Sequence, residues 1–239
     1  MPDAMSDPRL DLVERFFRGT GSTYDFMVHV ATCGIDRRWK RRMVDIVRER
    51  VVQPRAILDL ACGTGISTFA LARAFPEARI IGVELREEYL HLARAKPECG
   101  RYPKVEFVLS RAETFETSER FDVVSASYLA KYADLAVLVE KSHTWLAPGG
   151  LLMMHDFTFP PHRLVAMVWR AYFWGLQRLG SKIFPAWKEV YEGLPTLIAQ
   201  TRWAPDLMAL LRLQGFENVA FEWETLGGSA IVTARLPSR

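Results

Sequence analysis

The sequence predicts an α/β fold with a doubly wound, mostly parallel sheet that helices cover on both faces. From residue 55 to residue 155, short apolar runs alternate with amphipathic helical segments, a pattern typical of successive β-α units. The first apolar run leads directly into a glycine-containing turn, and two strand-like runs stand near the C-terminus. Together these observations predict an open sheet that ends in an antiparallel edge strand.

The composition is that of a globular protein. The 239 residues are 49% hydrophobic and 25% charged, which excludes a disordered, collagen-like or coiled-coil chain. The net charge of +3 is too small to indicate nucleic-acid binding. Three cysteines without metal-ligand spacing predict no metal site and favour a reducing, cytoplasmic setting.

Residues 1–52 are expected to form an N-terminal helical cap, and residues 53–239 the core domain. Apolar residues at helical spacing begin at Leu10 and end at Val47, with three glycines between two helical faces. The acidic residues near the N-terminus are atypical of a signal or transit peptide, so we do not expect export.

Five short apolar runs are the expected parallel strands of the core. They are residues 56–61, 79–85, 105–110, 121–127 and 151–157. Helical segments near 66–75, 86–96 and 134–146 separate most of these runs, as the crossovers between parallel strands require.

A helical lid is expected as an insertion around residues 160–200. The stretch from Leu164 to Leu179 is apolar and aromatic, but it has only 16 residues and contains two arginines. A membrane span needs about 20 apolar residues. The stretch fits a core helix, a lid over a hydrophobic ligand or a helix lying on a membrane surface. Beyond a further helix, residues 218–224 and 229–235 are expected to pair as an antiparallel hairpin.

The turn after the first strand is the candidate cofactor site. Gly63 and Gly65 let the backbone approach a ligand closely and point free N–H groups at it. A dinucleotide site would have a third glycine where Thr68 stands, and the carboxylate of Asp59 would repel a pyrophosphate. An ammonium group, as in S-adenosylmethionine, would be attracted instead, while Glu84 ends the second strand and can accept ribose hydroxyls. These features disfavour a nicotinamide dehydrogenase. The alternative is that the glycine turn only begins a helix and binds no ligand.

Two motifs resemble those of class I S-adenosylmethionine-dependent methyltransferases, namely ILDLACGTG at 57–65 and LAPGG at 146–150. A narrower resemblance, to the ubiquinone/menaquinone-biosynthesis C-methyltransferase (UbiE-like) family, covers nearly the whole chain. It rests on TYDFMVHVATCGIDRRWKR at 23–41, DFTFP at 156–160, YEGLPTLI at 191–198, GFENV at 215–219 and TLGGSA at 225–230. The resemblance implies a Rossmann-like fold, S-adenosylmethionine as cofactor and a lipophilic acceptor, with the ring carbon of a quinone as first choice.

The resemblance also implies which residues contact the cofactor, beside the loop glycines and Asp59. They are Thr64 in the loop, Glu84 and Leu85 at the ribose, Arg111 and Ala112 near the adenine, and Ser127 near the methionine part.

Candidate catalytic residues lie after the fourth and fifth strands. Methyl transfer mainly requires alignment and desolvation, but C-methylation of a hydroquinone also requires removal of a phenol proton. His155 and Asp156 stand at the carboxyl end of the fifth strand, where open α/β sheets place ligand chemistry. Lys131 keeps a positive charge where the family carries a Gly-Leu-Arg-Asn run, and Tyr24 could bond an acceptor oxygen.

Each of these side chains also has an ordinary packing or hydrogen-bonding interpretation. O- or N-methylation of another aromatic or lipid-like molecule, and a noncatalytic cofactor-binding subunit, remain alternatives.

A basic cluster at residues 37–42 is the remaining surface feature, with five cations around Trp39. It fits a solvated helix face, a contact with anionic lipid, or one arginine turned inward to the cofactor carboxylate. We therefore expect a hydrophobic small-molecule partner and no nucleic acid. Peripheral membrane contact and a homo-oligomer remain open.

Overall fold

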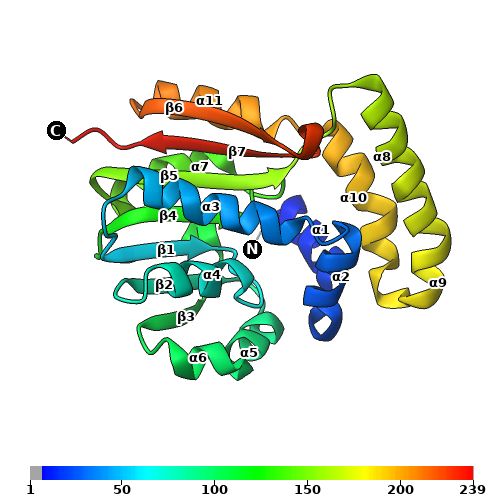
Figure 1. Cartoon of the computed structure of the whole chain (residues 1–239), viewed down its shortest axis with the longest axis horizontal. Helices are drawn as coiled ribbons and strands as arrows, with labels where there is room; N and C mark the ends of the chain where they lie inside the picture. The colour runs from blue at the N-terminus through cyan, green and yellow to red at the C-terminus, as the bar shows by residue number, and fades with distance from the viewer. Residues whose placement is uncertain (1–6, 239) are drawn as a thin grey trace, which may run out of the picture.

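A computed structural model of the chain, in which residues 7–238 are described, contains one seven-stranded sheet (Figure 1). The strands are β1 (Ala56–Leu60), β2 (Arg79–Glu84), β3 (Val105–Leu109), β4 (Phe121–Ser127), β5 (Leu146–Phe157), β6 (Glu217–Glu224) and β7 (Ser229–Arg235). Their order is β3-β2-β1-β4-β5-β7-β6. The first five strands of this order are parallel, and β7 runs antiparallel to both β5 and β6. The predicted fold class is confirmed.

One predicted strand begins later than the observed one. We expected the fifth strand at 151–157, whereas β5 starts at Leu146. The proline and glycines after Leu146 are typical of a turn, yet β5 pairs with β4 on both sides of them, and the register shifts in between. Phe121 is paired with Leu146, and Val123 with Leu151.

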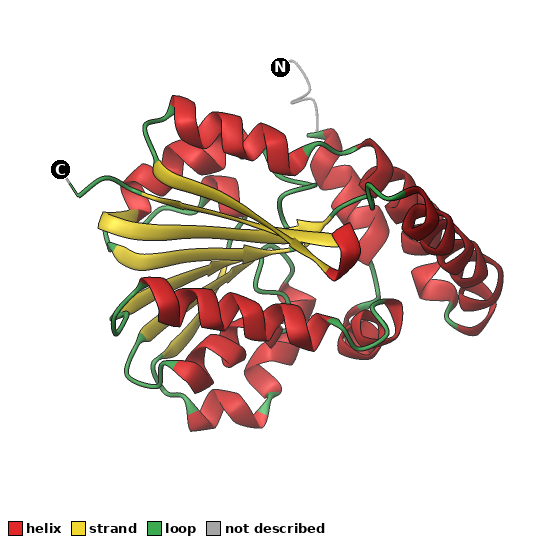
Figure 2. Cartoon of the chain, turned by 45° about the horizontal axis from the view of Figure 1, so that its top comes forward, coloured by secondary structure: helices red, strands yellow, loops and turns green. Residues whose placement is uncertain are grey.

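Helices cover both faces of the sheet, as Figure 2 shows. On one face, α7 (Leu135–Trp145) and α11 (Trp203–Leu213) pack against β1, β4, β5 and β7. The opposite face is covered by α3 (Asp36–Arg50) and α4 (Ile66–Ala74), and α5 (Glu87–Ala95) packs near β3, with the short α6 (Pro97–Arg101) after it. Both faces of the parallel strands are therefore buried, which explains why these strands form continuous apolar runs.

Helix α3 belongs to the layer that packs on the sheet. Its residues Met43, Ile46 and Val47 are buried in one cluster with Ile57 of β1 and Val123 of β4. The division at residue 52 remains a prediction, but these contacts make α3 part of the core.

The remaining helices gather beyond the carboxyl ends of the parallel strands (Figure 1). They are α1 (Pro8–Phe17), α2 (Tyr24–Ala31), α8 (Arg163–Gly175), a π-helical turn (Leu176–Gly180), α9 (Ser181–Ile183) and α10 (Lys188–Gln200). Phe16, Met27, Trp187 and Tyr191 join α1, α2 and α10 in a separate apolar cluster. Within residues 7–238, no helix combines the length and apolarity that crossing a membrane would require.

Candidate active site

The glycine loop joins β1 to α4 and has left-handed backbone at both glycines. Gly63 has φ +58° and Gly65 φ +82°, conformations that side-chain-bearing residues rarely adopt. A Cβ atom on Gly65 would lie 2.8 Å from Cε2 of Phe69, so this position also lacks room for a side chain. The loop is therefore built for a close approach of backbone to whatever lies above it.

Glu84, at the end of β2, faces this loop. Its carboxylate accepts the backbone N–H of Gly63 through Oε2 and that of Arg86 through Oε1, each at 2.9 Å. The side chain is almost completely buried, and burial raises the pKa of its carboxyl. Two fixed hydrogen bonds hold the carboxylate at the wall of a cavity, where it can also accept ligand hydroxyls.

That cavity, called here the cofactor cavity after the residues predicted for it, lies at the carboxyl ends of β1, β2, β3 and β4. It brings together most of the residues predicted for the cofactor: Gly63, Glu84, Leu85, Arg111, Ala112 and Ser127. Thr64 lines a narrow recess that continues from it, and Gly65 lies on an outer groove. The six residues of the cofactor cavity stand at or just after the ends of four strands, β1 to β4, which meet because parallel strands end at one edge of the sheet.

Arg111 lines the cavity with its charge already paired. Its guanidinium donates to Glu113 at 2.9 Å and to Asp7 at 2.5 Å, and these contacts raise its pKa further. The residue therefore contributes a wall between α1 and the sheet rather than a free cation.

Asp59 lies underneath the loop and is not among the described residues that line the cavity. Its fully buried carboxylate accepts hydrogen bonds from the hydroxyls of Ser67 (3.1 Å), Thr68 (2.7 Å) and Ser125 (2.8 Å). Burial raises the pKa of the Asp59 carboxyl although these three donors oppose the shift. Direct contact between Asp59 and a ligand ammonium stays a prediction, and the structure gives the carboxylate a role in tying β4 and the start of α4 to β1.

A second cavity adjoins the first and is called here the acceptor cavity, because Tyr24 and Lys131, both predicted to be catalytic, line it. Phe17, Tyr24, Tyr128 and Tyr132 line both. The rest of its wall is largely apolar: Met27, Val28, Ala31, Phe157, Phe173, Leu176, Trp187, Val190, Tyr191 and Leu194. The predicted Tyr24 thus stands at the boundary between the two cavities, with its ring 5.0 Å from Tyr89 and 6.0 Å from Trp187 between centroids.

Lys131 brings one cation into this apolar wall. Its Nζ donates to Asp156 Oδ1 at 2.6 Å and to the carbonyl of Tyr128 at 3.1 Å, and both side chains of the pair are almost fully buried. Asp156 Oδ2 also accepts the backbone N–H of Lys131 at 3.1 Å. Desolvation lowers the pKa of Lys131, and the adjacent carboxylate of Asp156 opposes that shift. The structure therefore joins two of the predicted catalytic residues as a buried ion pair.

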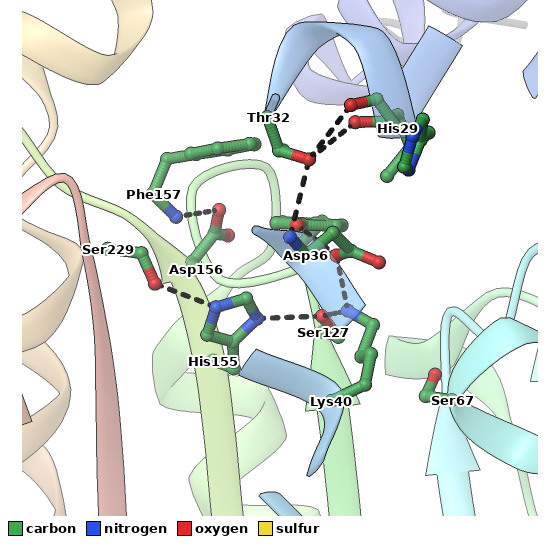
Figure 3. A network of polar contacts seen from close by, with 12 residues as sticks. His29, Thr32, Asp36, Lys40, Ser67, Ser127, His155, Asp156, Phe157 and Ser229 are labelled. Carbon is green, nitrogen blue, oxygen red and sulfur yellow. Dashed lines mark hydrogen bonds and ion pairs between the residues drawn. The ribbon is translucent and has the colours of Figure 1, made fainter. Parts of the chain in front are cut away.

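His155 is enclosed between two serines, as Figure 3 shows. Nδ1 lies 2.8 Å from Ser127 Oγ and Nε2 lies 2.7 Å from Ser229 Oγ, and the side chain is fully buried. Burial and the charges of Lys40 and Lys131 hold its pKa well below the ordinary value of 6.5, so the ring is neutral. Neither His155 nor Asp156 is among the described residues lining the cavities, so each can reach a ligand only through a neighbour.

Sequence reasoning missed Asp36 and Lys40 of α3. Both are buried, with Nζ of Lys40 3.4 Å from Asp36 Oδ1 and hydrogen-bonded to Ser127 Oγ. The basic cluster was expected to be a solvated face or to turn one arginine inward, but the buried cation is this lysine. Helical periodicity carried the signal, because positions 36 and 40 share a face with the buried Met43 and Val47.

Tyr132 was also missed as a site residue. Its phenol oxygen is buried and has no hydrogen-bond partner among the residues described, although the ring lies against both cavities. Nζ of Lys131 lies 4.4 Å from the centroid of this ring. A buried hydroxyl without a partner is rare in folded proteins, so this one is a candidate donor to a ligand.

Comparison with known proteins places these features in a family. The profile of the ubiE/COQ5 methyltransferase family matches residues 4–235. A demethylmenaquinone methyltransferase of Thermus thermophilus is 30% identical over 210 residues, which are 87% of this chain and 94% of that protein. The ubiquinone/menaquinone biosynthesis C-methyltransferase UbiE of Escherichia coli is 29% identical over 233 residues, 94% of this chain and 90% of that protein.

Solved structures share the fold at lower identity. The plantazolicin methyltransferase BpumL, in complex with SAH, has a TM-score of 0.70 at 14% identity and covers 96% of this chain and 95% of that one. Human N-acetylserotonin methyltransferase, in complex with SAM, has a TM-score of 0.63 at 14% identity and covers 97% of this chain and 60% of that one. At this identity the likeness concerns the fold alone.

Proposed function

The chain belongs to the ubiE/COQ5 methyltransferase family and is an S-adenosylmethionine-dependent methyltransferase, and on that premise we propose that it methylates a ring carbon of a reduced, lipophilic quinone. The observation that carries the acceptor proposal is the pairing of the two cavities. One holds a fixed carboxylate and backbone groups, and the other is apolar with a buried cation and an unpaired phenol. Such a wall suits a flat apolar ring that carries oxygen atoms.

The residues of the cofactor cavity fit S-adenosylmethionine. Glu84 offers a carboxylate for the ribose hydroxyls, and Leu85 with Ala112 offers an apolar wall for the adenine. When bound, S-adenosylmethionine supplies an electrophilic methyl group, and one proton is released for each methyl that a ring carbon gains.

Lys131 and Tyr132 would bind the oxygen of the acceptor ring. A ring carbon becomes nucleophilic when the neighbouring hydroxyl loses its proton, so the protein must stabilise negative charge on that oxygen. The ammonium of Lys131 and the hydroxyl of Tyr132, which has no hydrogen-bond partner among the described residues, are two donors on residues that line the apolar cavity. Asp156 positions Lys131 and keeps it charged, because a lysine buried without a partner would tend to lose its proton.

His155 and Tyr24 would shape the site without taking part in the reaction. His155 fixes the hydroxyl of Ser127, which lines the cofactor cavity, while Tyr24 separates the two cavities with its ring. Neither needs to exchange a proton with the acceptor in this arrangement.

The test is a methyl-transfer assay with 13C-methyl-labelled S-adenosylmethionine and a reduced demethylmenaquinone carrying a short prenyl chain. We expect a product heavier by one methyl whose carbon resonance is that of an aryl methyl. A methoxy resonance would move the activity to O-methylation, and the absence of any methylated quinol would overturn the proposed acceptor.

Tyr132→Phe gives this proposal a positional test. Because no described residue is hydrogen-bonded to this hydroxyl, thermal stability should be unchanged or slightly higher, while kcat/KM for the quinol should fall about 10-fold with the lost hydrogen bond. Tyr102→Phe, distant from both cavities, is the matched control. Unchanged kcat/KM in Tyr132→Phe would remove this residue from the acceptor site.

We further propose that the outer face of α8 rests on an anionic membrane surface. Residues 157–188 contain five lysines and arginines and no acidic residue. Leu164, Val168 and Trp174 on this helix are 63%, 65% and 59% exposed, whereas Phe173 and Leu176 line the acceptor cavity. An apolar face bordered by cations is typical of helices that lie in the membrane interface, and a prenylated acceptor would enter from there.

Vesicle sedimentation tests this contact. We expect binding to phosphatidylglycerol vesicles, weaker binding to phosphatidylcholine, and a loss in Val168→Ser/Trp174→Ser that the control Leu213→Ser, exposed on α11, does not show. Equal vesicle binding by the double variant and wild type would contradict the proposal. Self-association of the wild type that the double variant abolishes would instead assign this face to a homo-oligomer.

A further inference from the structure

A groove with basic walls, called here the basic groove, runs along the outside of the molecule between α3 and α4. Figure 1 shows both helices beside the sheet, whereas α8 lies beyond the carboxyl ends of the strands. The groove has a volume of about 900 Å³. Its cationic side chains come from α3, α4 and the end of α5, and they are Arg37, Lys40, Arg41, Arg48, Arg73 and Lys96.

Half of these cations have no carboxylate partner within residues 7–238, namely the exposed Arg37, Arg41 and Arg73. The other three form ion pairs with Asp36, Asp45 and Asp25, at N–O distances of 3.4, 3.1 and 2.6 Å. Among the described residues that line the groove, only one further carboxylate remains, that of Glu98. The walls therefore carry an excess of positive charge that the described part of the chain does not neutralise.

We propose that the basic groove binds an acidic helix of a partner protein. The inference depends on neither the cofactor nor the quinone acceptor, because Arg37, Arg41 and Arg73 are not among the described residues that line either cavity.

The spacing of the cations favours an extended ligand with repeated charges. Arg37, Arg41 and Arg48 follow one another along α3 over three helical turns. At a rise of about 1.5 Å per residue, this row is about 16 Å long. A single phosphate or carboxylate can contact only part of such a row, whereas a helix with a carboxylate at every turn can follow all of it.

The floor of the groove is apolar, as a docked helix requires. It consists of Val44 from α3 and Ile66, Phe69, Ala70 and Ala74 from α4. The two alanines leave a shallow channel into which the side chains of a third helix can pack. An amphipathic helix with small apolar residues on one stripe and glutamates beside it would match both the floor and the walls.

Other anionic partners match the groove less well. A membrane surface is flat and cannot follow a concave groove. Single-stranded nucleic acid stacks its bases on aromatic rings, but the one aromatic residue among the described lining residues, Phe69, is only 3% exposed. A second copy of the chain, paired symmetrically through this groove, would bring like charges together.

Fluorescence anisotropy with a labelled helical peptide of about 18 residues, five turns long, tests the proposal. The peptide carries a glutamate at every turn beside a stripe of alanine and leucine, and a matched peptide has glutamine in place of glutamate. We expect the chain to bind the glutamate peptide at least about 10-fold more tightly than the glutamine peptide. This difference should shrink with added salt, which screens exposed charges.

The triple variant Arg37→Gln/Arg41→Gln/Arg73→Gln removes the three unpaired cations and keeps good helix formers at these positions. It should bind the glutamate peptide about 10-fold more weakly than wild type does. An unchanged thermal midpoint would show that the variant is folded. Should it not fold, the comparison of the two peptides on wild type decides the question alone.

A matched control removes the same charge elsewhere. Arg55→Gln/Lys104→Gln/Arg212→Gln changes three exposed cations that do not line the groove, and it should bind the glutamate peptide as wild type does. Equal affinity of wild type for the two peptides, or the same loss in both triple variants, would overturn the proposal. So would tighter binding of labelled oligouridine that the groove variant loses, or self-association of wild type that this variant abolishes.

Discussion

The cofactor cavity and the acceptor cavity share three tyrosines, but they are built in different ways. Most of the cofactor wall comes from the ends of β1, β2, β3 and β4, each within a few residues of a strand. The acceptor wall combines α1 and α2, the segment after β4, the end of β5, and the helices from α8 to α10. Local β-α connections therefore create the first cavity, whereas packing between distant segments creates the second.

Their polar groups differ in the same way. The carboxylate of Glu84 is fixed by backbone N–H groups of its own sheet edge. The cation of the acceptor cavity, Lys131, is fixed by a carboxylate from another strand. A side-chain pair of this kind depends on both members, so the acceptor half should be the more sensitive to single substitutions.

Lys131→Met tests that sensitivity with the largest expected effect. It leaves Asp156 buried without its counter-ion, which costs about 3–5 kcal/mol of unfolding free energy and removes methyl transfer. Denaturant unfolding measures the loss, and the exposed Lys188→Met is the control. The double variant Lys131→Met/Asp156→Asn, which buries no unpaired charge, should recover much of the stability. A double variant no more stable than the single one would show that charge pairing is not the cause.

Asp59→Ala removes the buried carboxylate under the glycine loop of the cofactor cavity. Three buried hydroxyls, those of Ser67, Thr68 and Ser125, would lose their acceptor, so we expect a loss of about 2–4 kcal/mol in unfolding free energy. Cofactor affinity of the folded fraction should fall less than stability does. If calorimetry instead showed a large loss of affinity at unchanged stability, Asp59 would be a direct cofactor contact.

Glu84→Ala should separate cofactor binding from acceptor binding. We expect S-adenosylmethionine to bind about 1–3 kcal/mol more weakly because the hydrogen bonds to a buried carboxylate are lost. Glu87→Ala, a nearby exposed carboxylate on α5, is the control for calorimetry. Binding of the quinol, followed by intrinsic tryptophan fluorescence, should stay unchanged. An equal loss for both ligands would mean that the two cavities do not act as separate sites.

The pH dependence of stability concerns His155, whose ring contacts Ser127 of the cofactor cavity. Its pKa in the folded protein is below the ordinary 6.5, so the unfolded chain takes up this proton first as the pH falls. The stability contribution is complete above about pH 6.5 and is lost toward the folded pKa, by at most about 1.4 kcal/mol per pH unit.

Unfolding free energies measured at pH 7.5 and 5.5 test this expectation. His155→Gln should reduce the difference between the two pH values, whereas the exposed His162→Gln should leave it as in wild type. The same pH slope in His155→Gln and wild type would assign the acid sensitivity to other groups.

The sequence predicted the strands closely because parallel strands buried on both faces leave continuous apolar runs. It also predicted that Gly63, Glu84 and Ser127 lie close together, since each stands at a strand end, a place that chain position alone identifies. Their contact with the cofactor stays a prediction. For His155 and Asp156 the strand end was correct, but their surroundings were not foreseeable. One is enclosed by two serines and the other by a lysine from a different connection.

The sequence by itself determined the sheet, the glycine loop and the residues at its carboxyl edge, because short-range patterning fixes strands and the ends of parallel strands meet. Tertiary structure alone decided which charges are buried and which face each other. Lys40 stands in a run of cations but is the buried member, and Tyr132 is an apolar-cluster residue whose hydroxyl lacks a hydrogen-bond partner within residues 7–238. The reason is physical: burial and pairing depend on segments that lie far apart along the chain. Lys40 of α3 and Ser127 of β4 are 87 residues apart, and α1 packs against α10.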